Sequence, residues 1–410
     1  MIIGGDNLKL SGEIGKKFKS EGEFGEEVRL DLNNPHMITI CGKRGSGKSY
    51  SLGVIMEELM ELPSKARNNL SGFIIDTMGI YWSLQIANDG DELEDSDITP
   101  KEYPIKVYYP AGLEDKYEST KNYFHEGFEL YPSELNVDDW LYLMDIDETQ
   151  AQAGLLTQLL ETVKNEYGRY YGLNDIINEL ERTEESKNVK EALLRRLDKV
   201  QSYGIFSSTG NEIEEIIKGG DFAVLDLSGA GALPLNVRTI LTGLFIRKIY
   251  NKRTFERSRE EVQKVEGKTT KSSDFPLVWL FLDEAHQYAP SERNVPSTEP
   301  LVEWVRQGRR PGLSLVLATQ QPGALDQRIL SQCDTLMVHR LTAGKDSNAV
   351  GSKISELHGS KKISEYMKNI PKKPGYCYVM NDQTEQLVPV KIRARKSRHA
   401  GGSAKLEEYL

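Results

Sequence analysis

The chain has 410 residues, of which 38 % are hydrophobic and 28 % are charged, and its formal net charge is −10 at pH 7. This is the composition of a soluble globular protein with enough length for a large buried core. The acidic balance does not indicate a nucleic-acid-binding protein. It does not exclude one either, because a ring-shaped motor needs positive charge only where the polymer passes.

Cysteine usage and hydropathy predict a cytoplasmic protein. No run approaches the ~18 apolar residues of a membrane span, and the N-terminal apolar stretch is too short for a signal peptide. Three cysteines are widely spaced and form no metal-ligand pattern, which favours reduced thiols: Cys41, Cys333 and Cys377. We therefore expect no membrane contact.

In chain order, a short N-terminal segment (1–34) precedes the first part of an α/β core (35–112). Apolar residues at helical spacing predict a helix at 51–62. Apolar, β-branched runs predict strands at 28–34, 36–41, 72–77 and 105–112.

Over residues 113–219 the apolar residues recur at helical spacing, which predicts a helical insertion at one edge of the sheet. The core resumes over 220–345, with a long helix predicted at 235–258 and a polar surface loop at 260–274. A C-terminal segment and tail follow at 346–410. Further strands are predicted at 221–229, 276–284, 313–319 and 334–341, and similar runs lie at 375–380 and 386–394.

These elements predict an α/β fold. Apolar strands separated by helices indicate a largely parallel sheet with helices on both faces. In such sheets, ligands bind at the carboxyl ends of the strands. The sequence motifs fall at that edge.

The strongest motif is GKRGSGKS at 42–49, which fits the phosphate-loop pattern G-x-x-x-x-G-K-[ST] between a predicted strand and a predicted helix. Glycines there let backbone N–H groups surround phosphate oxygens. We expect Lys48 to contact the β- and γ-phosphates and Ser49 to bind Mg²⁺. The residues predicted to bind ATP are Gly42, Gly45, Ser46, Gly47, Lys48, Ser49 and Tyr50.

A second motif follows the predicted strand 276–284, where apolar residues lead directly into Asp283 and Glu284. Asp283 is predicted to hold Mg²⁺, and Glu284 to polarise the attacking water as general base. Adjacent acids can also simply begin an exposed loop. With a phosphate loop upstream, the pair favours ATP hydrolysis over static nucleotide binding.

Polar residues also follow the strand 313–319. Gln320 or Gln321 is expected beside the acidic pair as a sensor of the γ-phosphate, although an amide that caps the turn before Pro322 is an ordinary alternative.

The segment VRQGRRPG (305–312) carries three arginines in five positions. A solvated basic patch is the ordinary interpretation. The functional one is that a guanidinium contacts the nucleotide of a neighbouring subunit, with Arg309 preferred over Arg310 and Arg306.

Taken together, these motifs resemble the HerA–FtsK family of hexameric ring ATPases, and most closely its HerA-like branch. The segments that carry the resemblance are GKRGSGKS (42–49), FLDEAHQYAP (281–290), QGRRPGLSLVLATQQPGALDQRILSQCDT (307–335) and VPVKIRARKSRHAGG (388–402).

The resemblance implies a fold of the P-loop NTPase (RecA-like) type. It also implies a homohexamer that hydrolyses ATP with Mg²⁺ at subunit interfaces and threads duplex DNA through its channel. Arg309 matches the family's trans-acting arginine and Gln320 its polar sensor. Relatives work with an end-resection nuclease or with defence effectors, so such a partner is implied by kinship alone.

Three departures from the family limit this transfer. Members usually begin with a small β-barrel, most of which is expected to be missing here because the phosphate loop begins at Gly42. Ile80 stands where members often have an acid, which leaves Asp76. His36 stands where a basic residue often precedes the first core strand; it is interpreted mainly as an ordinary strand-start histidine.

Contacts to DNA cannot be assigned from the sequence. Solvated surface charge is the simpler interpretation for every candidate, and the tail could instead brace the next subunit. The candidates are 268–271, Lys361, Lys362, Arg393, Arg395, Lys396 and Arg398.

Three functions compete. The preferred one is an ATP-driven, hexameric, helicase-like DNA translocase. The second is a nucleotide-gated ring that regulates a partner effector, and the third is a DNA-packaging or transfer ATPase of a virus or mobile element.

Overall fold

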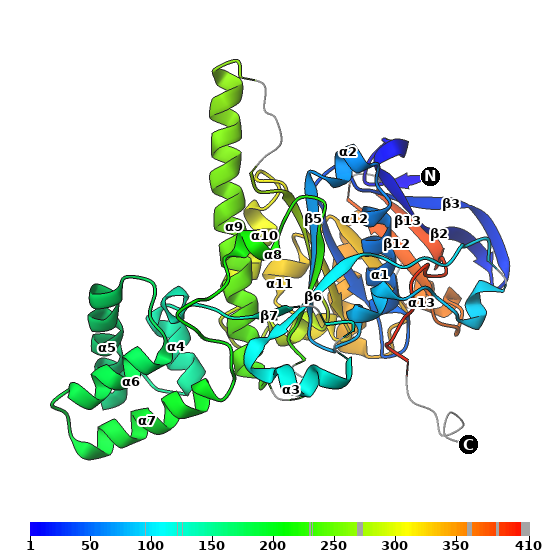
Figure 1. Ribbon diagram of the computed structural model, residues 1–410. Helices are drawn as coiled ribbons and strands as arrows, with labels where there is room; N and C mark the ends of the chain where they lie inside the picture. The colour runs from blue at the N-terminus through cyan, green and yellow to red at the C-terminus, as the bar shows by residue number, and fades with distance from the viewer. Residues whose placement is uncertain are drawn as a thin grey trace.

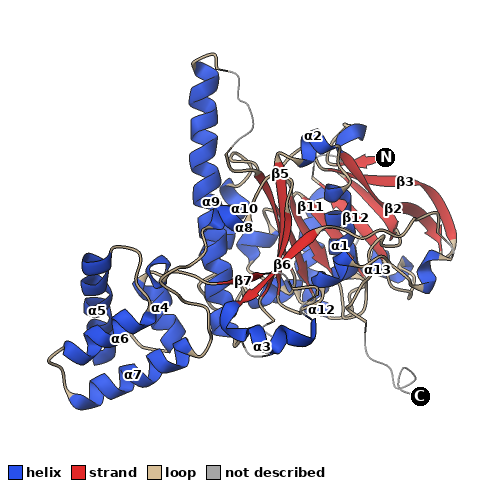
Figure 2. Ribbon diagram, viewed as in Figure 1, coloured by secondary structure: helices blue, strands red, loops and turns tan. Residues whose placement is uncertain are grey.

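The computed structural model describes residues 1–402 apart from 95, 121, 125, 229, 230, 232, 269–273, 359–362, 383 and 384. Within these residues the chain forms a 13-stranded sheet in the order β1-β3-β2-β13-β12-β11-β4-β10-β9-β5-β8-β6-β7 (Figures 1 and 2). The strands are β1 (Ile2–Ile3), β2 (Ser11–Ser20), β3 (Glu23–Asp31), β4 (Met37–Cys41), β5 (Leu70–Asp76), β6 (Ile105–Pro110), β7 (Glu126–Phe128), β8 (Phe222–Asp226), β9 (Leu277–Leu282), β10 (Leu313–Thr319), β11 (Thr335–His339), β12 (Tyr376–Asn381) and β13 (Gln386–Ile392).

Every neighbouring pair of strands from β11 to β7 is parallel. β12, β13, β2 and β3 then continue the sheet in antiparallel pairs. All residues of β4, β5, β8, β10 and β11 are buried, as expected for parallel strands covered on both faces. The predicted α/β fold with a largely parallel sheet is therefore confirmed.

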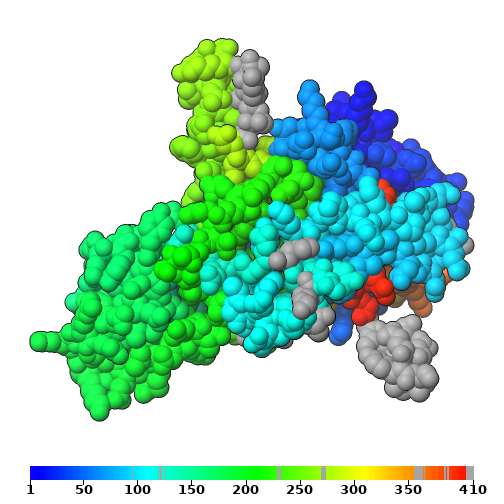
Figure 3. Space-filling model, in the orientation of Figure 1, coloured from blue at the N-terminus to red at the C-terminus, as the bar shows by residue number. Residues whose placement is uncertain are grey.

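The α-helices connect and flank these strands. They are α1 (Lys48–Met60), α2 (Ser64–Arg67), α3 (Glu114–Tyr117), α4 (Val137–Met144), α5 (Ala151–Tyr167), α6 (Leu173–Arg182), α7 (Lys187–Gln201), α8 (Ile213–Ile216), α9 (Leu235–Val265), α10 (Thr298–Gln307), α11 (Gln327–Leu330), α12 (Gly344–His358) and α13 (Ile363–Asn369). Helices α5, α6 and α7 form a lobe that stands out from the rest of the molecule (Figures 1 and 3). This lobe lies within the stretch predicted to be helical.

Two local predictions were incomplete. The N-terminal segment was expected to hold one strand, but it contains β1, β2 and β3. The charged sequence of β2 obscured it, because an antiparallel strand can leave the side chains of one face in water. Pairing of Lys17 with Val390 and of its neighbours along β13 holds β2 in the sheet.

The expected surface loop at 260–274 is wrong over its first residues, because α9 continues to Val265 and projects beyond the body of the molecule (Figure 1). Ion pairs one or two turns apart stabilise this extension. Glu260 binds Arg253 at 2.7 Å and Arg257 at 3.2 Å, and Arg257 also binds Glu261 at 3.2 Å. Residues 269–273 of the predicted loop lie outside the described part of the chain.

Candidate active site at the carboxyl ends of the strands

The phosphate loop joins β4 to α1 and has the backbone geometry of a phosphate cradle. Gly45 and Gly47 have φ angles of 71° and 107°, in the left-handed region that glycine enters without a steric clash. Gly47 directly precedes α1, whose first-turn N–H groups have no partner within the helix. Lys48 is buried, its Nζ donates to the carbonyl oxygen of Lys43 at 3.2 Å, and burial lowers its pKa.

The other residues predicted to bind ATP lie in the loop or in the first turn of α1. Gly42 packs so tightly that a Cβ there would lie 2.5 Å from Ser46 Oγ. Ser46 Oγ is buried without a hydrogen-bond partner among the described residues. Tyr50 differs, because its hydroxyl accepts from the Arg395 N–H at 2.5 Å and donates to Glu92 at 3.4 Å. The C-terminal tail therefore holds the Tyr50 side chain.

Asp283 lies at the carboxyl end of β9 and is held by three donors. Its Oδ2 accepts hydrogen bonds from Ser49 Oγ at 2.5 Å and from the Tyr81 hydroxyl at 2.9 Å. Its Oδ1 accepts from the Glu284 N–H at 2.8 Å. Because Ser49 donates its proton to Asp283, the oxygen lone pairs of Ser49 are available to a cation.

Glu284 is a buried residue with a strained backbone, at φ 52°. Gln320 donates from its amide to Glu284 Oε1. Oε2 has no hydrogen-bond partner among the described residues, and His286 Nδ1 lies 3.5 Å from it. Burial raises the Glu284 pKa; the adjacent Asp283 adds to this, while the bond from Gln320 opposes it. A buried carboxylate with one free acceptor oxygen suits proton transfer.

These groups fit a nucleoside triphosphate with a magnesium ion. The left-handed glycines and the first turn of α1 can accept phosphate, while Ser49 and Asp283 supply the hard oxygen ligands that Mg²⁺ prefers. Within the described residues, no group of three or more His, Cys, Asp or Glu side chains could hold a metal ion. An ion held by Ser49 and Asp283 would take its remaining ligands from phosphate oxygens and water.

Two residues of this site were missed by the sequence analysis. Tyr81 follows β5 within the segment where only acids were considered, and His286 lies two residues after the acidic pair. His286 Nδ1 is also 3.1 Å from Thr319 Oγ1, at the end of β10. Their positions in the sequence could have identified both residues, since Tyr81 and His286 each follow a buried strand closely enough to reach the same edge of the sheet. Gln321, the second glutamine considered, is exposed.

Arg309 lies at the opposite end of the sheet, because it precedes β10 whereas the phosphate loop follows β4. At about 3.3 Å per residue, the seven residues of β10 span roughly 20 Å. The Arg309 side chain is 58 % exposed, and its Nη2 donates to Asp334 at 3.0 Å. Arg309 is therefore too far to contact the phosphate loop of its own chain. Of the other two arginines, Arg310 binds Glu261 at 2.8 Å, and Arg306 is exposed.

His36 lies at this second end and is buried between two carboxylates. Its Nε2 is 3.1 Å from Asp31, and its Nδ1 is 3.1 Å from Asp334. Burial disfavours the charged ring, but the two carboxylates outweigh burial and raise the His36 pKa from 6.5 to about 9. The interpretation of His36 as a structural residue at the start of a strand therefore fits its contacts.

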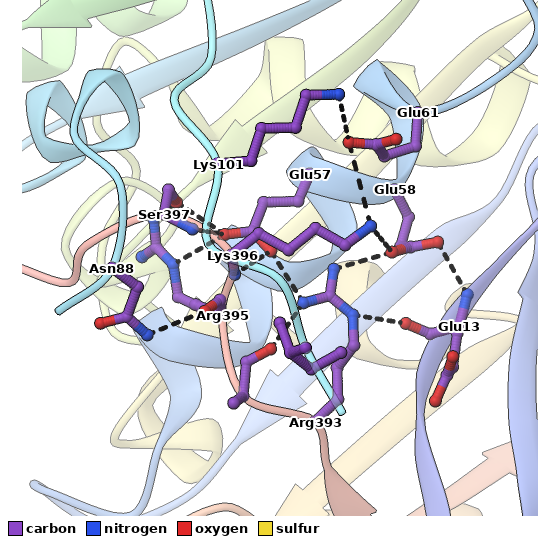
Figure 4. Close-up of polar contacts among 12 residues, drawn as sticks. Glu13, Glu57, Glu58, Glu61, Asn88, Lys101, Arg393, Arg395, Lys396 and Ser397 are labelled. Carbon is purple, nitrogen blue, oxygen red and sulfur yellow. Dashed lines mark hydrogen bonds and ion pairs between the residues drawn. The ribbon is translucent and has the colours of Figure 1, made fainter. Parts of the chain in front are cut away.

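The C-terminal tail packs on α1 of the same chain, which corrects two candidates for DNA contact (Figure 4). Arg393 donates to Glu57 at 2.8 Å and to Glu58 at 2.7 Å, and Arg395 donates to Glu57 at 3.3 Å. Ser397 Oγ completes the cluster with a bond to Glu57 at 2.6 Å. Because both arginines are buried and paired, neither is available to DNA.

The remaining candidate cations give no further support for a DNA-binding surface. Three of them form ion pairs within the chain: Lys396 with Glu58, Arg398 with Asp89, and Lys268 with Glu266. Residues 269–271, Lys361 and Lys362 lie outside the described part of the chain. All three cysteines are buried and free of disulfides, and no described helix is long and apolar enough to span a membrane.

Comparison with known protein families identifies the family of this chain. The model of the family described as "Helicase HerA, central domain" matches residues 13–249, which is more than half of the chain. The chain belongs to this HerA family. The phosphate loop lies within the matched range, and α9 begins within it and ends beyond it. Asp283, Glu284 and Arg309 lie beyond the range.

Curated relatives include two proteins named "DNA double-strand break repair helicase HerA". The protein of Sulfurisphaera tokodaii is 22 % identical over 356 residues, covering 82 % of this chain and 61 % of the relative. That of Pyrococcus furiosus is 21 % identical over 352 residues, covering 79 % and 60 %. The chain thus spans about three-fifths of the length of these HerA relatives.

Solved structures support the fold. VirB4 of Thermoanaerobacter pseudethanolicus superposes with a TM-score of 0.60 at 14 % identity, over 95 % of this chain and 98 % of that one. The bacterial conjugative coupling protein TrwB gives a TM-score of 0.51 at 13 % identity, over 98 % of both chains. Both likenesses concern the fold alone.

The His36 contacts predict a loss of stability at alkaline pH. A histidine whose pKa is raised on folding contributes fully below its unfolded value near 6.5 and loses this contribution as pH rises through about 9. The free energy of unfolding should fall by about 3 kcal/mol over that window. Urea unfolding of wild type and His36→Asn at pH 6, 7.5 and 9 tests this; an equally steep fall in His36→Asn would contradict it.

The Glu57 cluster predicts a large effect of a small change. Glu57→Gln leaves buried Arg395 and Arg393 without their main counter-charge and should destabilise the protein by about 3–5 kcal/mol. Glu26→Gln, which removes an exposed partner of Lys17, serves as the control and should leave the urea midpoint unchanged. Equal midpoints for the two variants would refute a stabilising role of the tail cluster.

Proposed function

We propose that this protein is a ring-forming ATPase that couples ATP hydrolysis to movement along duplex DNA. The observation that supports this most directly is the convergence of Lys48, Ser49, Asp283, Glu284 and Gln320 at one edge of the sheet. Relatives named as DNA repair helicases support DNA as the second ligand. The remaining steps follow from the chemistry of these side chains.

In the proposed reaction, Lys48 and the loop N–H groups bind the β- and γ-phosphates, and Ser49 with Asp283 would hold Mg²⁺. The ion, when bound, offsets the negative charge of the phosphates. Glu284 Oε2 accepts a proton from a water molecule while the oxygen of that water molecule attacks the γ-phosphorus. The bond between this phosphorus and the bridging oxygen breaks, and ADP and phosphate leave. Gln320 keeps Oε1 occupied and so orients Oε2.

A second copy of the chain completes the proposed site. Developing charge on the γ-phosphate is commonly neutralised by an arginine, and Arg309 is exposed but about a strand's length from its own phosphate loop. A contact from Arg309 to a neighbour's nucleotide joins unlike surfaces of two copies. Such head-to-tail contacts form a ring when the rotation between copies closes, and a closed ring of six copies is the homohexamer expected from the family.

We propose that the protein binds DNA through a limited part of its surface and without preference for base sequence. A translocase contacts phosphates rather than base edges, so its affinity falls as salt rises. For the effector partner expected from the family, a nuclease or defence protein, we propose no docking surface.

ATP hydrolysis should therefore be stimulated several-fold by linear duplex DNA at low salt, and less at moderate salt. Lys48→Ala should lose ATP binding, whereas Glu284→Gln should bind ATP but hydrolyse it at least about 100-fold more slowly, because the proton acceptor is gone. Phosphate release with and without DNA measures this. Hydrolysis that is equal in all DNA conditions would instead favour the nucleotide-gated scaffold.

A further inference from the structure

Tyr81 is a buried residue that connects β5 to the proposed metal site. Its side chain is fully buried, and its hydroxyl donates to Asp283 Oδ2, the same oxygen that Ser49 contacts. A tyrosine hydroxyl carries one proton that it can donate, and here that proton is directed at a carboxylate oxygen of the proposed metal site.

The backbone that carries Tyr81 is fixed by the last residue of β5. Asp76 Oδ1 accepts from the N–H groups of Met78 at 3.0 Å and Gly79 at 2.8 Å. Asp76 Oδ2 accepts from the N–H groups of Ile80 and Tyr81, both at 2.8 Å. Four bonds to one carboxylate hold this turn in a single conformation. Asp76, the acid that remained in this segment, thus acts on the site through the backbone.

A comparison of the donors around Asp283 indicates what Tyr81 contributes. Without the Tyr81 hydroxyl, Oδ2 would keep only Ser49, whose own oxygen is also expected to bind the ion. The bond from the Glu284 N–H to Oδ1 would remain, but the carboxylate would have more freedom to rotate about its Cβ–Cγ bond until the ion bound. With Tyr81 present, Oδ1 and Oδ2 are both held by groups that are not metal ligands, namely the Glu284 N–H and the Tyr81 hydroxyl.

We propose that Tyr81 is a positioning residue that orients the Asp283 carboxylate for a divalent cation bound with the nucleotide. This inference rests on the ATPase function proposed above and extends it to a residue outside the phosphate-loop and acidic motifs. Tyr81 itself does not contact the ion. Groups that orient metal ligands in this way typically change metal affinity about 10- to 100-fold when removed.

Tyr81→Phe tests the proposal because it removes one oxygen and keeps the packed ring. Mn²⁺, used as the probe for Mg²⁺, is titrated into the full-length protein with a non-hydrolysable ATP analogue, and free Mn²⁺ is followed by electron paramagnetic resonance. We expect about tenfold weaker Mn²⁺ binding in Tyr81→Phe. Binding of the analogue in EDTA should be unchanged, and raising Mg²⁺ should restore most of the rate of ATP hydrolysis.

Tyr103→Phe is the matched control. Tyr103 is also buried, but its hydroxyl donates to Glu61 at 2.9 Å, at the far end of α1 from the phosphate loop. Mn²⁺ affinity within twofold of wild type in Tyr81→Phe would overturn the proposal, as would equal weakening in both variants. A wild-type protein that binds no analogue and hydrolyses no ATP would instead overturn the proposed function itself.

Discussion

The parallel pairing of β4, β10 and β9 is the constraint on which the proposed chemistry depends. These strands are far apart in sequence, yet their carboxyl ends meet at one edge of the sheet. The phosphate loop, Gln320 and the Asp283–Glu284 pair therefore converge without any long loop to position them. β5 adds Tyr81 to the same edge, since it pairs directly with β9. The hydrogen bonds on Asp283 connect these segments into one site.

The two ends of the sheet differ in how their buried charges are compensated. At the carboxyl end, Glu284 Oε2 has no hydrogen-bond partner in the described part of the chain, which suits a group that must accept a proton. At the amino end, both carboxylates beside His36 are fully engaged, and Asp334 also binds Arg309. The carboxyl end therefore keeps one carboxylate oxygen that can accept a proton. The arrangement at the amino end fixes the start of β4 and holds Arg309 at the surface.

The core strands and the phosphate loop could be predicted from the sequence, because each is specified by a local pattern of residues. Apolar runs identified the core strands, and the phosphate loop is specified by its own glycines and Lys48. The order of β4, β9 and β10 within the sheet could not be derived from periodicity, so Gln320 was only one of two glutamines expected beside the acidic pair, and its bond to Glu284 was not predicted. The tail was misjudged for a related reason: Arg393 and Arg395 look like surface charge until α1 supplies Glu57. Long-range ion pairs leave no local signal.

In the proposed function, one catalytic site is built from two copies of the chain. Co-expression of Lys48→Ala with Arg309→Ala tests it most directly, because each variant alone lacks one half of every site. If Arg309 acts on the neighbouring copy, mixed rings contain interfaces with an intact loop and an intact arginine, and ATP hydrolysis should recover to about a quarter of the wild-type rate. Mixed assemblies that form but hydrolyse no more ATP than either variant alone would contradict the account.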